Sequence, residues 1–428
     1  MTATQSAAGP VRDSALPNPT GTGASATARG GPERSSRTPA SLPRLVLALA
    51  SCNFVSAAGG FARPFLVLFL TQERQLPTAT VGSVAAAVGA GAIGSLLLGG
   101  WLGDRIGRRR TMLVGYLGSA LGLVALGSAE HVLVIWMAAV GVGLTSELHR
   151  PAGTTTVADL PDSDQRVRAF GILYWAATLG FSVASVLGGV LARDGYGLLF
   201  WLNSAALVVA ALIVWRHVPE TRPAGPSEDR RALLPVLVRD RLMIAVALLM
   251  VGHFALLYQA FSTLPLVMAA DGLGPGTYGA MLAVNGIVIV VVQPIAVRLL
   301  ADRDRSTVLG RSMLLVGLGL GLNTVVDGGV GYAVTTLLWT LGEIGVAVMF
   351  GVTFADLAPA DLRGRYMGIA ATSWGLGTMI APVAGTALLD LAGPTGLWMT
   401  TAAVGIALYA GQRSVAPGLR RRIASRED

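Results

Sequence analysis

The stretch that decides the fold is Gly100-Trp101-Leu102-Gly103-Asp104-Arg105-Ile106-Gly107-Arg108-Arg109-Arg110. It lies between two apolar runs, at about 81–99 and 112–129. Because charges enter hydrocarbon only at a high free-energy cost, we expect a short, water-facing turn that joins two membrane-spanning helices. Gly107 permits the turn, and the arginines that follow it predict that the turn faces the cytoplasm.

Composition predicts that the whole chain is a membrane protein. Of its 428 residues, 53% are hydrophobic and only 13% are charged, and the mean hydropathy is +0.62. Soluble proteins usually carry about 25% charged residues. The 55 glycines are an excess that fits close packing of helices in a bilayer. We therefore expect an all-α protein with many membrane spans.

The basic residues exclude several kinds of chemistry. All 32 are arginine, whereas an ATP-binding P-loop and a Schiff-base cofactor both need lysine. The sequence also lacks His-Glu-x-x-His, Gly-x-Ser-x-Gly and any histidine pair at metal-ligand spacing. We expect no enzyme activity, no cofactor and no metal site. Because the arginines fall in short loops, the net charge of +8 does not predict binding to nucleic acid.

Apolar segments recur at the length of about 20 residues that a bilayer requires. The predicted spans are about 44–70, 79–101, 111–129, 132–157, 167–191, 197–216, 241–268, 277–299, 308–326, 331–357, 365–390 and 396–413. Twelve spans place both termini on one side of the membrane. The loops that follow even-numbered spans hold most of the arginines, so the positive-inside rule places those loops and both termini in the cytoplasm.

The spans divide into two halves. The longest gap between spans, 217–240, is rich in proline and predicts a cytoplasmic linker between six-helix bundles at 43–216 and 241–413. Residues 1–42 are polar and lack an apolar run, so we expect a disordered cytoplasmic tail there. We expect a second cytoplasmic tail at 414–428.

The two halves also repeat each other. The matched pairs are Asp159 with Asp356, Arg166 with Arg363 and Arg168 with Arg365 at an offset of 197, Asp104-Arg105 with Asp302-Arg303 at 198, and Asn53 with His253 at 200. An offset that stays within three residues over such distances predicts two parallel six-helix repeats.

The pattern Gly-x-x-x-Asp-Arg-x-Gly-Arg-Arg, which begins at Gly100, resembles the loop 2–3 signature of the Major Facilitator Superfamily of secondary transporters. Pro219-Glu220-Thr221, at the end of span six, also resembles a recurrent element of that family. The resemblance covers about residues 44–413. It implies two pseudo-symmetric six-helix bundles that work by alternating access.

In that family, the aspartate of this loop lies against the start of helix eleven, and the arginines join a cytoplasmic charge network that favours the outward-open state. The matching residues and their repeats are Gly100, Asp104, Arg105, Gly107, Arg108, Arg109, Asp302, Arg303, Asp159, Arg166, Arg168, Asp356, Arg363 and Arg365. A carboxylate is favoured at a helix N-terminus beside arginine, so we expect Asp104 near Gly364-Arg365 and Asp302 near 166–168. The alternative is that these charges only fix the topology.

Four ionisable side chains fall within predicted spans, where such groups are functional candidates because their insertion is costly. They are Arg63, Glu147, His253 and Glu343. Glu343 is the first candidate for a proton carrier, with an ion pair to Arg63 or a structural hydrogen bond as alternatives. Glu147 is the second candidate, with pairing to Arg150 as the alternative. His253 titrates or forms a structural hydrogen bond, and Arg63 pairs with Glu343 or recognises an anion.

Aromatic and polar side chains within the spans are candidates to line a substrate cavity. They are Asn53, Arg63, Tyr174, Trp175, Tyr258, Gln259, Asn285, Trp339, Glu343 and Trp374. A cavity rich in aromatic groups and poor in charge fits amphipathic or apolar substrates.

The resemblance reaches the twelve-helix drug:proton antiporters, although span five has Ala184-Ser185 where their signature has Gly-Pro. It implies a monomer in the plasma membrane of a bacterium that exports small amphipathic or toxic compounds, with protons as the coupling ion. The alternative is a proton-coupled symporter that takes up a metabolite or short peptide.

Overall fold

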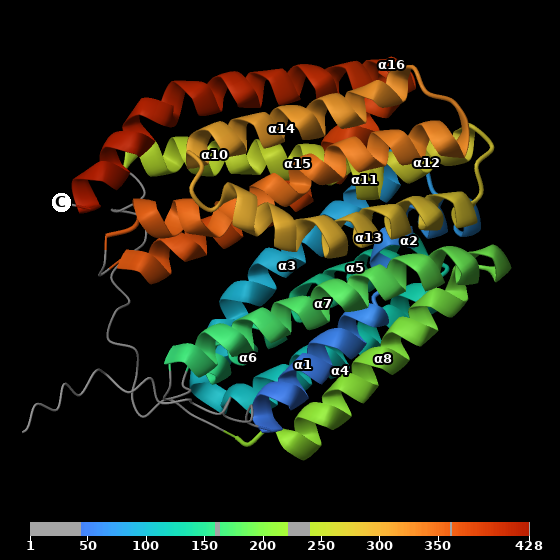
Figure 1. The fold of residues 1–428 in the computed structure, drawn as a ribbon. Coiled ribbons are helices and arrows are strands. Elements are labelled where there is room, and N and C mark those ends of the chain that lie inside the picture. The colour runs from blue at the N-terminus through green and yellow to red at the C-terminus, as the bar shows by residue number, and fades with distance from the viewer. Residues whose placement is uncertain (1–43, 159–162, 221–239, 360–361, 428) are drawn as a thin grey trace, which may run out of the picture. The chain divides into compact units, whose positions relative to one another are not determined.

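A computed structural model of the chain describes residues 44–158, 163–220, 240–359 and 362–427. Within these ranges the chain is helical and contains no strand, as the sequence predicts. The expected tail at 1–42 and the candidate Asp159 lie outside the described residues. Figure 1 shows the helices in two groups, one from the first half of the chain and one from the second.

The first half contains several short helices as well as long ones. Its elements are α1 (Arg44–Ala58), α2 (Ala62–Leu68), the π-helical turn η1 (Phe69–Glu73), α3 (Thr78–Ile106), α4 (Arg108–Ser128), α5 (Val132–Ser146), α6 (His149–Ala158), α7 (Ser163–Leu191), the 3₁₀ turn η2 (Ala192–Asp194) and α8 (Gly197–His217). The predicted spans one and four are therefore interrupted, the first between α1 and α2 and the other between α5 and α6.

The second half is built in a similar way. Its elements are α10 (Arg241–Leu257), α11 (Gln259–Ser262), α12 (Leu264–Ala270), α13 (Pro275–Leu300), α14 (Arg305–Gly321), the 3₁₀ turn η3 (Leu322–Thr324), α15 (Gly328–Leu357) and α16 (Arg363–Glu427). Span seven is interrupted twice, on either side of α11, so it corresponds to the interrupted span one of the first half.

Ten helical stretches among the described residues are long and apolar enough to cross a membrane. With 17 residues, α14 is shorter than these stretches. One stretch, Arg365–Ala424, covers the last two predicted spans. Within it Gly393 has φ 66° and ψ −177°, which marks a turn between two helices. The count of twelve stays a prediction, and the last helix continues to Glu427, beyond the expected end of span twelve at 413.

The distribution of side chains is that of a membrane protein. Large apolar side chains point outward, among them Leu121 and Leu133, which are 72% and 70% exposed. Polar side chains such as His253 and Asn285 are fully buried. Because lipid is as apolar as leucine, helices in a bilayer associate through close packing and polar contacts rather than through the hydrophobic effect.

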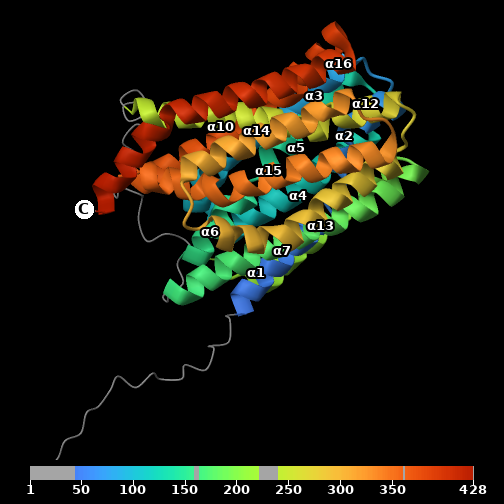
Figure 2. The same ribbon diagram turned by 45° about the horizontal axis from the view of Figure 1, so that its top comes forward.

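The two halves meet mainly through two pairs of helices, α3 with α16 and α7 with α13, and also where α2 contacts α11 and α12. Figure 2 shows α7 and α13 side by side. At Gly189 on α7, an added Cβ would lie only 2.5 Å from the Cα of Gly279 on α13. Glycine at both positions therefore allows the two backbones to touch.

The interface between α3 and α16 is tight near one end and open at the other. An added Cβ at Gly89 would lie 3.0 Å from the Cα of Met379. The exposed Gly100 lies 11 residues further along α3, on nearly the same helix face, but an added Cβ there would meet nothing within 4 Å. The same is true of the exposed Gly368 on α16. Among the described residues, α3 and α16 are thus apart at the end that carries the 100–110 turn, which we call the arginine-rich end, and packed together at the opposite, far end.

Candidate functional site

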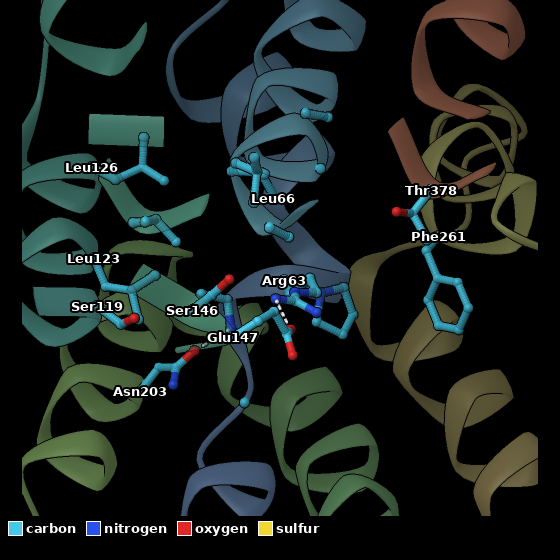
Figure 3. Close-up of a pocket in the computed structure, with 18 of the residues that line it drawn as sticks. Arg63, Leu66, Ser119, Leu123, Leu126, Ser146, Glu147, Asn203, Phe261 and Thr378 are labelled. Carbon is cyan, nitrogen blue, oxygen red and sulfur yellow. Dashed lines mark hydrogen bonds and ion pairs between the residues drawn. The ribbon is translucent and has the colours of Figure 1, made fainter. Parts of the chain in front are cut away.

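A cavity of about 410 Å³ lies between the halves, and Figure 3 shows part of its lining. Most of the lining residues belong to the first half. Tyr258, Phe261 and Trp374 are among those that the second half contributes. The cavity therefore lies where a rocking motion of the two halves would expose it to alternate sides.

Two interrupted helices place charged side chains in this cavity. Arg63 is the second residue of α2, just after the break from α1, and Glu147 lies in the break between α5 and α6. The backbone N–H of Glu147 donates a hydrogen bond to the Ser95 hydroxyl, at 3.0 Å. Backbone groups that a helix break leaves unpaired are tolerated at membrane depth where they line a cavity.

Glu147 lies between two arginines. Its side chain is only 3% exposed, and its carboxylate oxygens lie 3.2 Å from Arg63 Nη2 and 2.7 Å from Arg150 Nε. The arginine side chains are 48% and 58% exposed. The expected pairing of Glu147 with Arg150 is confirmed, and Arg63 pairs with Glu147 rather than with Glu343. The cluster has one buried carboxylate and two half-exposed guanidinium groups, and hence a formal charge of +1.

Aromatic rings of the second half face this cluster. The Arg150 guanidinium lies 5.8 Å from the centroid of the Trp374 ring, within the range of a cation–π interaction. Tyr258 packs against Trp374 and Phe261, with ring centroids 6.3 Å and 5.3 Å away. Arg150 therefore links the charge cluster of the first half to the aromatic wall of the second half.

Glu343 occupies a separate polar site between α13 and α15. Asn285 donates hydrogen bonds from its Nδ2 to Glu343 Oε2 at 2.8 Å and to Thr340 Oγ1 at 3.0 Å. Among the described residues, no cation lies within ion-pair distance of Glu343. The amide oxygen of Asn285 is buried and has no hydrogen-bond partner among the residues that the structure describes. Glu343 and Asn285 are outside the lining of the central cavity.

Three of the expected cavity residues, Arg63, Tyr258 and Trp374, line the central cavity. The other expected residues lie outside its lining, and several of them contact other helices instead. Asn53 donates to the Leu173 carbonyl, Gln259 donates to the carbonyls of Ala255 and Ala381, and Trp339 is 1% exposed. Tyr174 and Trp175 are 50% and 45% exposed, and the Tyr174 hydroxyl contacts Gln293 of the second half.

His253 is buried against Phe254, with ring centroids 5.3 Å apart. Neither of its ring nitrogens has a hydrogen-bond partner among the described residues. A structural hydrogen bond was one of the two alternatives predicted for His253, and it is not found in the described part of the chain.

The turn at the arginine-rich end is held by a residue that sequence reasoning did not assign to it. The Glu220 carboxylate accepts hydrogen bonds from the backbone N–H groups of Arg109, at 3.1 Å, and Arg110, at 3.3 Å. Gly107 has φ +95°, and an added Cβ there would clash with this carboxylate. Glu220 thus satisfies free N–H groups at the start of α4. Only its likeness to a family element marked it in the sequence.

The expected contact of Asp104 with the start of α16 is not found among the described residues. Asp104 is exposed and makes no hydrogen bond or ion pair with any described residue, and the same holds for Asp302. The halves are apart at this end, so a contact between Asp104 and α16 is not to be expected here.

The remaining charged residues of the predicted network make local contacts, are exposed, or have side chains outside the described residues. Arg105 stacks on Trp101 at 5.0 Å, Arg108 donates to the Thr155 carbonyl at 3.3 Å, and Asp356 pairs with Arg305 at 2.7 Å. Arg168 and Arg303 are exposed, and Arg365 is half-buried. The side chains of Arg166 and Arg363 lie outside the described residues.

Comparison with known proteins places this geometry in a family. The family model of the Major Facilitator Superfamily matches residues 49–267 and 260–411. The uncharacterized MFS-type transporter YqjV of Bacillus subtilis is 27% identical over 349 residues, which cover 79% of this chain and 85% of YqjV. Multidrug resistance protein MdtH of Proteus mirabilis is 24% identical over 333 residues, 74% of this chain and 81% of MdtH.

A solved structure shows the same fold. The peptide transporter POT in complex with sulfate superposes with a TM-score of 0.74 at 18% identity, over 89% of this chain and 96% of that one. The family match covers nearly all of the described helices in both halves of the chain. The chain is a multi-pass membrane transporter for small molecules, not an enzyme, and it belongs to the Major Facilitator Superfamily.

Proposed function

We propose that this transporter exports small amphipathic compounds in exchange for protons, by alternating access, from the inner membrane of a bacterium. The observation that carries the proposal is the cavity between the halves, where Glu147 is buried between two half-exposed arginines, one of which, Arg150, lies over the aromatic ring of Trp374. A charged group beside an aromatic wall suits a solute with a polar and an apolar part. Several relatives carry the name multidrug resistance protein, which favours export.

The two halves, 43–216 and 241–413, rock as bodies joined by the linker 217–240. The arginine-rich end faces the cytoplasm, because positive loops stay on that side. The loose contacts at this end and the tight ones at the far end then describe an inward-open state. Both termini lie in the cytoplasm, and a monomer performs the whole cycle.

Glu343 is the proton carrier of this proposal, and Glu147 belongs to the substrate site. A buried carboxylate without a cation is costly in a low-dielectric interior, so Glu343 exchanges a proton when water reaches it. Its partner Asn285 precedes Gly286 on α13, where an added Cβ would lie 2.8 Å from Ser182 Oγ of α7. The proton site is therefore one residue from a contact between the halves, which supports a link between protonation and rocking.

Transport in inverted vesicles tests the coupling. Glu343→Gln should abolish transport driven by a pH gradient while substrate exchange without a gradient continues, because the neutral amide mimics the protonated carboxyl. Glu130→Gln, which changes an exposed acid in a loop at the far end, is the matched control and should transport normally. Loss of both activities in Glu343→Gln would show a structural role and would contradict the assignment.

The second candidate is proton-coupled uptake of a metabolite or short peptide. The fold that this chain shares with a peptide transporter is compatible with this second function. The two directions differ in the sign of the proton flux. Substrate added outside inverted vesicles should make the lumen alkaline if the protein exchanges substrate for protons, and acidic if the two move together.

A further inference from the structure

We propose that the preferred substrates are amphipathic anions, with the anionic group at Arg63 and Arg150 and the apolar tail in a side arm of the cavity inside the first half. This inference rests on the proposed function, since it names the substrate class of the same cavity. Two independent features of the lining carry it, namely the balance of charge and the position of the apolar side chains.

The charge of the cavity favours an anion. Among the described residues that line it, Glu147 is the only acid, and it faces two arginines. A guanidinium has five N–H donors, and the contacts to Glu147 involve Nη2 of Arg63 and Nε of Arg150. Both side chains are about half exposed, so their remaining donors can hold a carboxylate or sulfonate. His149, also in the lining, stacks on Tyr116 at 4.6 Å and adds no negative charge.

The apolar arm lies on the first-half side of this cluster. Its lining residues come from α2, α4, α5 and α8 and are Leu66, Leu123, Leu126, Val142, Phe200 and Leu207. Figure 3 shows Leu123 and Leu126 on one side of the Arg63–Glu147 pair, and Phe261 and Thr378 of the second half on the other. Only Ser119 and Asn203 bring polar groups to the α4 and α8 walls. An unbranched alkyl or aryl tail fits this arm while its charged head stays at the arginines.

The length of the tail gives a quantitative expectation. Each methylene that moves from water into an apolar site strengthens binding about fourfold. Octanoate has four more methylenes than butyrate, so it should bind on the order of 200-fold more tightly if the whole tail enters the arm. A cation with the same tail should bind more weakly than octanoate because it meets two arginines.

Equilibrium binding to the full-length protein in phosphatidylcholine nanodiscs tests the inference, with empty nanodiscs subtracted. The probes are octanoate, butyrate, octan-1-ol and octyltrimethylammonium at pH 7.5. We expect octanoate to bind most tightly and butyrate to bind on the order of 200-fold more weakly. Equal affinity for octanoate and octyltrimethylammonium, or equal affinity for octanoate and butyrate, would overturn the proposal.

A pair of variants locates the tail. Leu123→Trp fills the arm and should remove the advantage of octanoate over butyrate, whereas Leu121→Trp, on the outward face of the same helix and 72% exposed, should keep it. Arg63→Gln should reduce the preference for octanoate over octan-1-ol. Identical behaviour of the two tryptophan variants would contradict the assignment. If Leu123→Trp does not fold, the probe series on the unaltered protein still decides.

Binding at equilibrium needs neither a proton gradient nor movement of the halves. Normal octanoate binding without proton-driven transport would therefore contradict only the coupling proposed above. Proton-driven export of other solutes without octanoate binding would contradict only the inference of an anionic substrate.

Discussion

Among single residues, Glu147 is the one on which the proposed substrate site most depends. Its link to Arg150 follows from a spacing of three residues and could be predicted as an ion pair. Its link to Arg63 joins positions 84 apart, and nothing in either segment identifies the other. Glu147 is buried, so its charge is stable only while a cation compensates it.

Glu147→Gln should therefore lower the thermal stability of the purified protein and abolish transport. The two arginines would face each other without a counter-ion, and because both are about half exposed, we expect a loss on the order of 1–2 kcal/mol. A thermal unfolding curve in detergent measures it, with Glu130→Gln as the control. An unfolding midpoint that stays at the value of the unaltered protein would contradict the role given to this cluster.

At the scale of the element, the ends of corresponding helices are stabilised by different devices. The start of α4 is capped by Glu220, which follows α8. The start of α14 is capped by Asp304, which accepts a hydrogen bond from the Thr307 N–H at 2.8 Å and is held by Arg420 through two contacts of 2.9 Å. One helix start is thus capped directly by an acid from a distant segment, and the other by a local acid that a distant arginine holds.

Gly107→Ala should destabilise the turn at the arginine-rich end. A non-glycine residue at φ +95° is strained, and its Cβ would displace the carboxylate that caps α4. We expect a cost of about 1–3 kcal/mol in unfolding free energy. Gly100→Ala, which meets open space, is the control for thermal unfolding. Equal midpoints for the two variants would mean that Glu220 does not cap this helix.

The cap of α14 predicts a pH dependence. Hydrogen bonds from Arg420 hold the pKa of the Asp304 carboxyl well below its usual range, and those from Thr307 act in the same direction. A folded-state pKa below the unfolded value stabilises the fold at pH above about 4, and this stabilisation is lost as the pH falls through the folded-state pKa. Asp304→Asn should therefore be less stable than the unaltered protein at pH 7, with a difference that shrinks toward pH 3.

The neighbouring variant Asp302→Asn provides the control, because Asp302 is exposed and has no partner among the described residues. It should unfold like the unaltered protein at every pH. A constant difference for Asp304→Asn from pH 7 to pH 3 would contradict the assigned ion pair.

The sequence predicted the helices better than their interruptions. The span expected at 197–216 coincides with α8, Gly197–His217, because an apolar run of bilayer length has few other structures available. The breaks before Arg63 and at Glu147 were not predicted as breaks. A helix stops there because surrounding helices satisfy the freed backbone groups, as Ser95 does for Glu147, and a local pattern does not contain that information.

Across the whole molecule, contacts between the two halves are tight at the far end. At the arginine-rich end, the described parts of α3 and α16 lie apart. The repeat in the sequence predicts two bundles but not which end is closed, because both states use the same spans. Asp104 makes no contact with another described residue here, so we predict that a gating role of Asp104 belongs to the state in which this end is closed.

Asp104→Asn should leave thermal stability unchanged and slow transport. In the closed state we expect its carboxylate at the start of α16, where a helix N-terminus favours negative charge, so the amide would stabilise that state less. Turnover measured in vesicles at matched expression tests this. Normal turnover would show that the aspartate only helps to fix the topology.

Distances between spin labels at both ends test the rocking motion most directly. In a Cys52→Ala background, one labelled pair is Trp101→Cys with Met367→Cys, on α3 and α16 at the arginine-rich end. The other pair is Gln75→Cys with Leu391→Cys at the far end. When the pH is changed between 8 and 5.5, we expect one distance to shorten while the other lengthens. Distances that stay fixed, or that change in the same direction at both ends, would contradict it.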